Sequence, residues 1–296
     1  MPNSLSQQQT GVICALGAFA LWGVFPVYFK AVDYVPPLEM LCHRIVWSAL
    51  LLLVLLYFSR GFGEIKEALK KPRVIALLSV TGLLIALNWL VFIYAVMNGM
   101  IAEASLGYFI NPLINIMLGI LFLKEKTTTL EKIAIAIAFF AIALEIIKLG
   151  RAPYIALFLA FSFGFYGLIR KMMRTGSFSG LFIETSLIAR FSVAYLVYLG
   201  FSHTLSFSFD DSWLIMFSGP VTVVPLLLFA GAASRIRLGT VGFIQYLSPT
   251  ITFSLAILVY NEPLSIGRLV TFALIWLSLI FVIIDSLIQK QKRKTT

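Results

Sequence analysis

Ten apolar runs, each long enough to form a helix that crosses a bilayer, constrain this chain more than any other feature. A hydrocarbon core about 30 Å thick requires about 20 mostly apolar residues in a helix. The runs lie near residues 11–30, 38–58, 73–96, 101–123, 130–148, 153–170, 181–201, 213–233, 239–260 and 266–288. Only 12% of the residues are charged, against about 25% in a typical soluble domain. We therefore predict an all-α integral membrane protein with ten transmembrane helices.

The connections between the runs are short. The longest, residues 59–72, contains the segment GEIKEALKK, which predicts a short amphipathic helix at the membrane surface. The first run follows a stretch without Lys or Arg and lacks an obvious cleavage site, so we expect a retained span rather than a signal peptide.

The sequence contains no signature of metal, cofactor or enzyme chemistry. Cys14 and Cys42 both fall inside apolar runs, and there is no CxxC pair or Cys/His cluster. A glycine-rich phosphate loop, an HExxH motif and a GxSxG motif are also missing from the sequence. We therefore predict no metal, no cofactor and no enzymatic activity.

The distribution of basic residues predicts the orientation in the membrane. With the N-terminus in the cytoplasm, the inner connections and the tail carry 17 Lys and Arg, the outer connections carry 4, and Arg44 and Arg190 lie within runs. Cytoplasmic loops carry such an excess, so we expect both termini in the cytoplasm. The net charge of +10 then reflects topology, and we predict the lipid bilayer rather than nucleic acid as a partner. The basic tail is expected to be a stop anchor, with binding to anionic lipid as an alternative.

Two stretches share one plan, which predicts an internal repeat. Pro112 lies thirteen residues before Glu125, and Pro249 lies thirteen before Glu262. One ungapped offset of 137 places the first stretch on the second and aligns residues 88–145 with 225–282. Each half holds five runs, an odd number, so the second half would insert upside down. We predict two inverted five-helix repeats, residues 1–148 and 149–296, with a ligand site between them near the bilayer midplane.

Polar side chains inside the runs are the candidate site residues, because such groups are costly in hydrocarbon unless they are paired or face water. Those expected to bind a solute near the midplane are Asn88, Trp89, Tyr108, Asn111, Asn115, Gln245 and Tyr246. His43 and Arg44 are expected to guard the outer side of the same site. A structural alternative remains open, because amides and small residues on one helix face also suit close helix packing.

Glu39 and Glu103 are the candidates for proton or ion coupling. Glu39 lies one turn before His43, and a histidine changes charge near neutral pH, which suits a proton-linked step. The alternatives are a structural ion pair for Glu39 with His43, and a solvated position near the outer end of its helix for Glu103.

The two prolines of the repeat are expected to loosen their helices. Pro112 and Pro249 each remove a backbone donor, which frees a carbonyl near Tyr108 and near Gln245. These carbonyls need partners from the protein or from a water-filled cavity.

Four further charged residues are expected to have structural roles. Glu184 and Arg190 lie in the same run and are interpreted as a structural pair. Glu125 and Glu262 lie at the ends of their runs, where each is expected to accept hydrogen bonds from a neighbouring helix terminus.

Several segments spread over the chain resemble one known family. They are ALWGVFPVYFK at 20–30, EMLCHRIVWS at 39–48, NWLVFIYAV at 88–96, EASLGYFINPL at 103–113, FSFGFYGLIRK at 161–171 and GFIQYLSPT at 242–250. They resemble the RarD family of EamA-type transporters, in the drug/metabolite transporter superfamily. The resemblance implies a permease of the bacterial inner membrane, and the family label refers to chloramphenicol sensitivity, which is a phenotype. One departure is visible: the segment VMNGMIAEAS before and at Glu103 lacks a histidine that the family pattern leads us to expect.

These observations together predict a secondary-active transporter that moves a small organic metabolite or drug-like solute by alternating access. The resemblance favours export over uptake. Two other functions remain open, a non-transporting membrane scaffold or sensor, and a membrane-embedded enzyme that uses Glu39 and His43 as its catalytic pair. The identity of the solute and the formation of a homodimer are also left open.

Overall fold

The computed structural model describes residues 6–59, 62–98, 100–173, 176–206, 212–260 and 266–295, and the regular secondary structure in these ranges is helical. The helices are α1 (Gln7–Ala31), α2 (Pro37–Ser59), α3 (Phe62–Leu69), α4 (Pro72–Met97), α5 (Ile101–Leu123), α6 (Thr129–Leu149), α7 (Tyr154–Met172), α8 (Ser177–Phe201), α9 (Ser212–Met216), α10 (Ser218–Arg235), α11 (Leu238–Gln245), α12 (Leu247–Leu258) and α13 (Ile266–Thr295). The prediction of an all-helical chain is confirmed for these residues.

Nine helical segments in the described part of the chain are long and apolar enough to cross a membrane. They coincide with nine of the ten predicted runs, with α9 and α10 forming one segment and α11 and α12 another. The remaining run corresponds to α6, whose first turn is capped by Thr128 and Glu131 and whose C-cap residue is Gly150. The tenth crossing stays a prediction. The short helix expected between residues 59 and 72 is present as α3.

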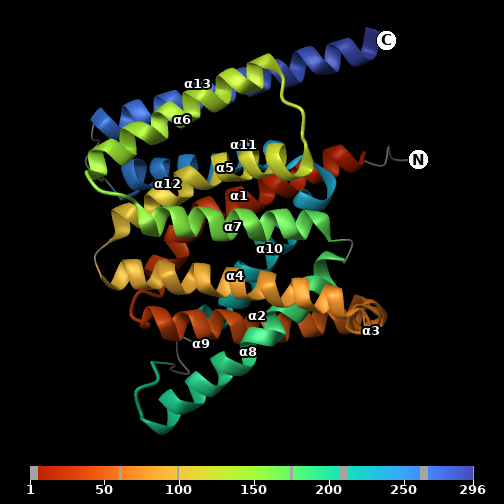
Figure 1. Cartoon of the computed structure of the whole chain (residues 1–296). Coiled ribbons are helices and arrows are strands. Elements are labelled where there is room, and N and C mark those ends of the chain that lie inside the picture. The colour runs from red at the N-terminus through yellow and green to blue at the C-terminus, as the bar shows by residue number, and fades with distance from the viewer. Residues whose placement is uncertain are drawn as a thin grey trace.

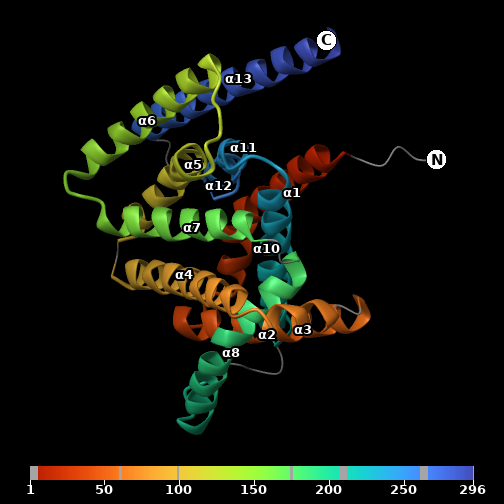
Figure 2. The ribbon, with the colours of Figure 1, turned by 45° about the vertical axis from the view of Figure 1, so that its right-hand side comes forward.

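Figure 1 shows most of the long helices running roughly alongside one another, with α6 and α13 paired at one edge and α8 leaning away at the other. Helix α1 packs against α10, α4 against α7, α2 against α8, and α5 against both α7 and α11. Figure 2, turned by 45°, again places the N- and C-termini toward the same side of the molecule. Helices from the first 148 residues therefore pack mainly against helices from the rest of the chain.

An aromatic cluster fills the centre where α1, α7 and α10 meet. The rings of Phe19 and Trp22 from α1 and of Phe163 and Tyr166 from α7 surround Phe229 of α10. The closest of these contacts joins Phe163 and Phe229, with ring centroids 5.1 Å apart. Each such pair contributes about 0.5–1.5 kcal/mol beyond the burial of its apolar area. This cluster fixes the helices that surround the candidate site.

A stripe of polar and small residues spaced four apart forms one buried face of α5. Its members are Glu103, Gly107, Asn111, Asn115 and Gly119. The stripe faces α7 on one side and α11 on the other, and Gly242 lets α11 approach closely. A Cβ atom on Gly242 would lie 2.6 Å from the carbonyl oxygen of Pro112, closer than real atoms approach. The spacing of four residues therefore predicted correctly which face of α5 packs.

The two prolines behave differently. Helix α5 continues through Pro112, so the expected loosening produces no interruption there. The missing donor removes one hydrogen bond, and packing against α7 and α11 holds the rest of the helix. In the second half, α11 ends at Gln245, four residues before Pro249, and α12 begins at Leu247, two residues before it. Helical structure is thus divided just ahead of Pro249.

Candidate functional site

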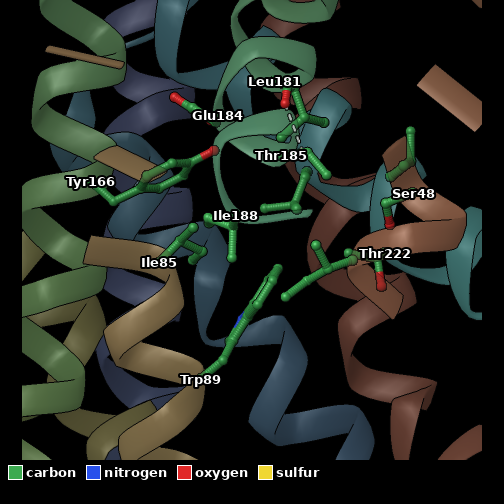
Figure 3. A pocket seen from close by; sticks show the side chains of 12 residues that line it. Ser48, Ile85, Trp89, Tyr166, Leu181, Glu184, Thr185, Ile188 and Thr222 are labelled. Atoms are coloured by element: carbon green, nitrogen blue, oxygen red, sulfur yellow. Dashed lines mark hydrogen bonds between the residues drawn. The ribbon is translucent and has the colours of Figure 1, made fainter. Parts of the chain in front are cut away.

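A narrow pocket lies between α2, α4, α7, α8 and α10; its empty volume of ≈ 400 Å³ includes space open to the surroundings, and the centres of water-sized molecules have ≈ 20 Å³ in it, which is room for about one water in this conformation. Its polar lining residues are Ser48, Trp89, Tyr166, Glu184, Thr185 and Thr222. Figure 3 shows the Trp89 ring reaching in from one side, Ser48 and Thr222 on another, and the Tyr166 hydroxyl directed inward near Glu184. The lining thus combines apolar walls with a few convergent polar groups, as is typical of small-molecule sites.

Buried polar atoms line this pocket without hydrogen bonds of ordinary geometry. The Ser48 hydroxyl has no partner among the described residues. The Tyr166 hydroxyl and the second carboxylate oxygen of Glu184 interact electrostatically but do not form a well-aligned hydrogen bond. All three residues are buried. Buried polar atoms of this kind are uncommon in folded proteins, because they lose hydration without gaining a partner. A polar solute group or water in the pocket would satisfy them.

Glu184 is paired with Arg170, and the predicted pair with Arg190 is wrong. Glu184 Oε1 lies 3.4 Å from Arg170 Nη1 and accepts a hydrogen bond of 2.6 Å from the Thr81 hydroxyl. Arg190 is exposed and its Nε donates to the Leu187 carbonyl of its own helix. The reason is helical geometry: at about 3.6 residues per turn, positions six apart point to different faces.

Arg44 borders the pocket. Its Nε donates to Thr222 Oγ1 at 3.0 Å, and its guanidinium carbon lies 4.9 Å from the centroid of the Trp89 ring. Glu39 and His43 lie one turn away from each other on the same helix, with 3.6 Å between Glu39 Oε1 and His43 Nε2. Both are buried, and Glu39 Oε1 also accepts a hydrogen bond from the Ser206 backbone. This geometry agrees with the structural interpretation of Glu39 and His43, and their proposed binding and coupling roles stay predictions.

Three of the predicted amides form a buried cluster that joins α5 to α11. Asn115 Nδ2 donates to Gln245 Oε1 at 2.7 Å and to Asn111 Oδ1 at 3.1 Å. Gln245 Nε2 donates to Asn111 Oδ1 at 2.9 Å. The cluster does not line the pocket described above. In this conformation the amides hold two helices together, and their role in solute binding stays a prediction.

The remaining predicted residues are distributed over three places. Asn88 Nδ2 donates to the Leu159 carbonyl at 2.9 Å and to the Ser162 hydroxyl at 2.8 Å, which ties α4 to α7. Tyr108 is 53% exposed and packs edge-on against Phe92. Tyr246 is fully buried against α6 and α13, away from the pocket. Of all the predicted residues, only Trp89 lines the pocket, and Arg44 lies at its border.

Sequence reasoning did not assign Ser48, Tyr166 or Thr222 to the site. Each is a hydroxyl-bearing residue inside an apolar run, which is a weak signal because serine and threonine hydroxyls commonly bond to their own helix and tyrosine is common near membrane interfaces. Their convergence depends on how α2, α7 and α10 are rotated, and a spacing pattern within one run does not report that rotation.

The glutamates at the two ends of α5 each bind the start of another helix. Glu103 is 3% exposed, pairs with Arg151 at 2.7 Å and accepts from the Ile155 backbone, so the alternative of a solvated carboxylate is wrong, and its coupling role stays a prediction. The reason is that α7 begins beside it, and a helix N-terminus stabilises a carboxylate. Glu125 accepts from the backbone of Leu238 at 2.7 Å and from that of Gly239 at 2.9 Å, which confirms its predicted role.

Glu262, the counterpart of Glu125, lies outside the described residues. Within those residues, no three His, Cys, Asp or Glu side chains gather in a way that would hold a metal ion.

The nine segments of the described residues that are long and apolar enough to cross a membrane, and the pocket between five helices, fit a multi-pass helical membrane protein. The model of the EamA-like transporter family matches residues 9–147. Protein RarD of Salmonella typhi is 41% identical over 290 residues, which cover 97% of this chain and 99% of that protein. The uncharacterized transporter YojE of Bacillus subtilis (strain 168) is 40% identical over 295 residues, covering 98% and 99%.

A chain of known crystal structure shares the fold, with a TM-score of 0.72 at 16% identity over 93% of this chain and 97% of that one. The chain belongs to the EamA family of transporters, and its full-length homologues include proteins named RarD.

Proposed function

We propose that this transporter is a secondary-active exporter of a small organic solute in the bacterial inner membrane, and that the solute binds in the pocket beside Arg44 and Trp89. The observation that carries the proposal is the position of this pocket between the two halves of the chain. Ser48 and Trp89 belong to the first 148 residues, whereas Tyr166, Glu184 and Thr222 belong to the remainder. Transporters built from inverted repeats bind their substrates at such an interface.

The pattern of helix contacts supports the proposed inverted repeats, residues 1–148 and 149–296. If the five helices of each half correspond in order, α1 corresponds to α7 and α4 to α10. The contact of α1 with α10 then has its counterpart in the contact of α7 with α4. The contacts of α2 with α8, α5 with α11, and α6 with α13 each join two corresponding helices. The family match that ends at residue 147 lies close to the proposed boundary.

The proposed topology has ten crossings and both termini in the cytoplasm. Two observations support it: the termini lie toward the same side of the molecule in Figure 1, and most basic residues fall in connections on that side. An even number of crossings requires both termini on one side of the membrane. The excess of Lys and Arg that is usual in cytoplasmic loops accounts for the basic residues on that side.

Alternating access requires that one end of the pocket closes while the other opens. Contacts at the proposed cytoplasmic end support a conformation closed on that side. Glu125 binds the start of α11, and Arg237 bridges to Glu131 at 3.0 Å. Lys171 donates to the carbonyls of Ala233 and Ile236 at the end of α10. We propose that these contacts separate when the transporter opens toward the cytoplasm.

Transport by the purified protein in liposomes tests the proposal. Chloramphenicol, amino acids and amphipathic drugs would be offered as radiolabelled solutes, with and without an imposed pH gradient. We expect at least one solute to cross faster than in empty liposomes, and Trp89→Leu to slow it. Trp213→Leu is the matched control, because Trp213 is 63% exposed and does not line the pocket. No flux of any solute through well-folded protein, or equal flux through Trp89→Leu, would contradict the proposed function.

A further inference from the structure

Arg44 lies well inside a membrane helix and is only half-buried. It is the eighth residue of α2 (Pro37–Ser59), so at a rise of about 1.5 Å per residue it lies about 10 Å from the helix start. An ionised side chain at such a depth is costly unless it is paired or faces a cavity. The partners of Arg44 therefore indicate whether its charge serves the fold or a ligand.

Three helices hold the guanidinium in place without neutralising its charge. Thr222 of α10 accepts from Nε at 3.0 Å. The guanidinium carbon lies 5.2 Å from the Phe29 ring centroid on α1 and 4.9 Å from that of Trp89 on α4. Tyr28 and Tyr108 are near enough to contribute to its electrostatic surroundings. The guanidinium is thus oriented by one hydrogen bond and two aromatic faces.

Among the described residues, no carboxylate lies within 4.0 Å of Arg44, whereas Arg151, Arg170 and Arg237 each have a glutamate within that distance. The nearest acidic residue along the helix, Glu39, is already bound to the Ser206 backbone and lies beside His43. The two terminal nitrogens of Arg44 make no hydrogen bond in the described structure, and they are not among its fully buried, unsatisfied atoms. Their hydrogen-bonding capacity is therefore not used by the described residues.

We infer that Arg44 binds the anionic group of the transported solute, and that the solute is an organic anion with an aromatic or similarly flat apolar body. This inference rests on the proposed function and specifies its substrate class. A guanidinium presents a planar pair of donors that matches a carboxylate, sulfonate or phosphate. Trp89 and Thr222 both line the pocket and both contact Arg44, so an anionic group on Arg44 places the body of the solute among the apolar walls.

Equilibrium binding to the purified, full-length protein in detergent tests the inference. The probes are benzenesulfonate, which stays charged at all working pH values, its neutral analogue benzenesulfonamide, and the cation trimethylphenylammonium. Quenching of tryptophan fluorescence reports binding, since Trp89 lies beside the guanidinium. We expect benzenesulfonate to bind at least about tenfold more tightly than the other two, because a charge-assisted hydrogen bond contributes at least that much.

Three variants separate the charge of Arg44 from general effects on the protein. Arg44→Gln is expected to lose at least about tenfold in affinity for benzenesulfonate and to keep its affinity for benzenesulfonamide. Arg44→Lys keeps the charge but lacks the paired donors. Its affinity for benzenesulfonate is expected to lie between that of the wild type and that of Arg44→Gln. Arg190→Gln is the matched control, because Arg190 is exposed and also has an aromatic contact, with Phe191. Size-exclusion profiles identify any variant that fails to fold, and Arg44→Lys then provides the comparison.

The outcomes distinguish this inference from the proposed function. Equal affinity of the wild type for the anion and its neutral analogue, or unchanged anion affinity in Arg44→Gln, would overturn the anion site even if the protein transports a neutral solute. Arg44-dependent binding of benzenesulfonate without flux of any solute in liposomes would support the anion site and contradict transport.

Discussion

Arg44 and Arg170 are two arginines in membrane helices with opposite surroundings. Arg170 is 5% exposed and lies 3.4 Å from Glu184, and Gly180 leaves room for its guanidinium, since a Cβ there would lie 2.1 Å from Nη1. Arg44 is half-buried and touches aromatic rings and a threonine instead of a carboxylate. A charge that the fold already compensates stabilises the fold, whereas one left uncompensated beside a pocket remains available to a ligand.

The largest expected effect is on stability, from replacing the compensated arginine. Arg170→Met leaves the buried Glu184 carboxylate without its charge partner, which costs about 3–5 kcal/mol. Unfolding of the detergent-solubilised protein by heat or denaturant measures this loss. Arg190→Met is the control, because Arg190 is exposed and has no carboxylate partner among the described residues. A loss below about 1 kcal/mol would contradict a structural role for Arg170.

A double variant sharpens the assignment of this pair. In Arg170→Met, the additional change Glu184→Gln removes the unpaired charge, and the glutamine can still accept from the Thr81 hydroxyl. We therefore expect the two changes together to cost less than the sum of the single changes, with a coupling of about 1–3 kcal/mol. The same unfolding measurement on the four proteins of the cycle gives this value. Additive losses would show that Arg170 and Glu184 act independently.

The sequence predicts features that depend on spacing within one run, but not those that depend on how neighbouring helices are rotated. The buried stripe on α5 and the binding of Glu125 to the next helix were predictable, because they depend on spacing within one run and on where runs end. The partner of Glu184 was not, because it depends on how α7 and α8 are rotated after their connecting turn. The wrong pairing of Glu184 with Arg190 could have been avoided from spacing alone, since six residues do not bring side chains to one helix face.

The residues predicted for the candidate site also fall into two groups, those that lie at the pocket and those that bind other protein groups. Arg44 and Trp89 were identifiable as polar or aromatic groups inside apolar runs, and both lie at the pocket. The amides of Asn111 and Asn115 were identified by the same criterion but bind Gln245 instead, because Gly242 brings α11 against α5 at that level. Polarity inside a run marks a buried interaction, and the packing of the helices decides whether its partner is protein or solute.

A smaller effect on stability is expected from the uncompensated arginine. Arg44→Met loses two contacts with aromatic rings, each contributing about 0.5–1 kcal/mol, and the hydrogen bond to Thr222, which contributes about 1 kcal/mol. These losses are offset because the variant no longer places a charge inside the membrane. We expect the free energy of unfolding to change by less than about 1 kcal/mol, measured beside Arg170→Met under identical conditions. A loss as large as that of Arg170→Met would remove the contrast between the two arginines and favour a structural role for both.

Changing Thr222 is expected to affect anion affinity less than changing Arg44 itself, because we predict Thr222 to be a positioning residue that acts through Arg44. Thr222→Val keeps the shape of the side chain but removes the acceptor for Arg44 Nε, a hydrogen bond of 3.0 Å. Loss of one such bond corresponds to about 1 kcal/mol, so we expect affinity for benzenesulfonate to fall by about fivefold, with benzenesulfonamide unaffected. Thr222→Ser retains the hydroxyl and is expected to restore the preference for the anion. A purely structural role would weaken both probes equally, so the ratio of the two affinities, measured in all three proteins, decides whether Thr222 orients the guanidinium.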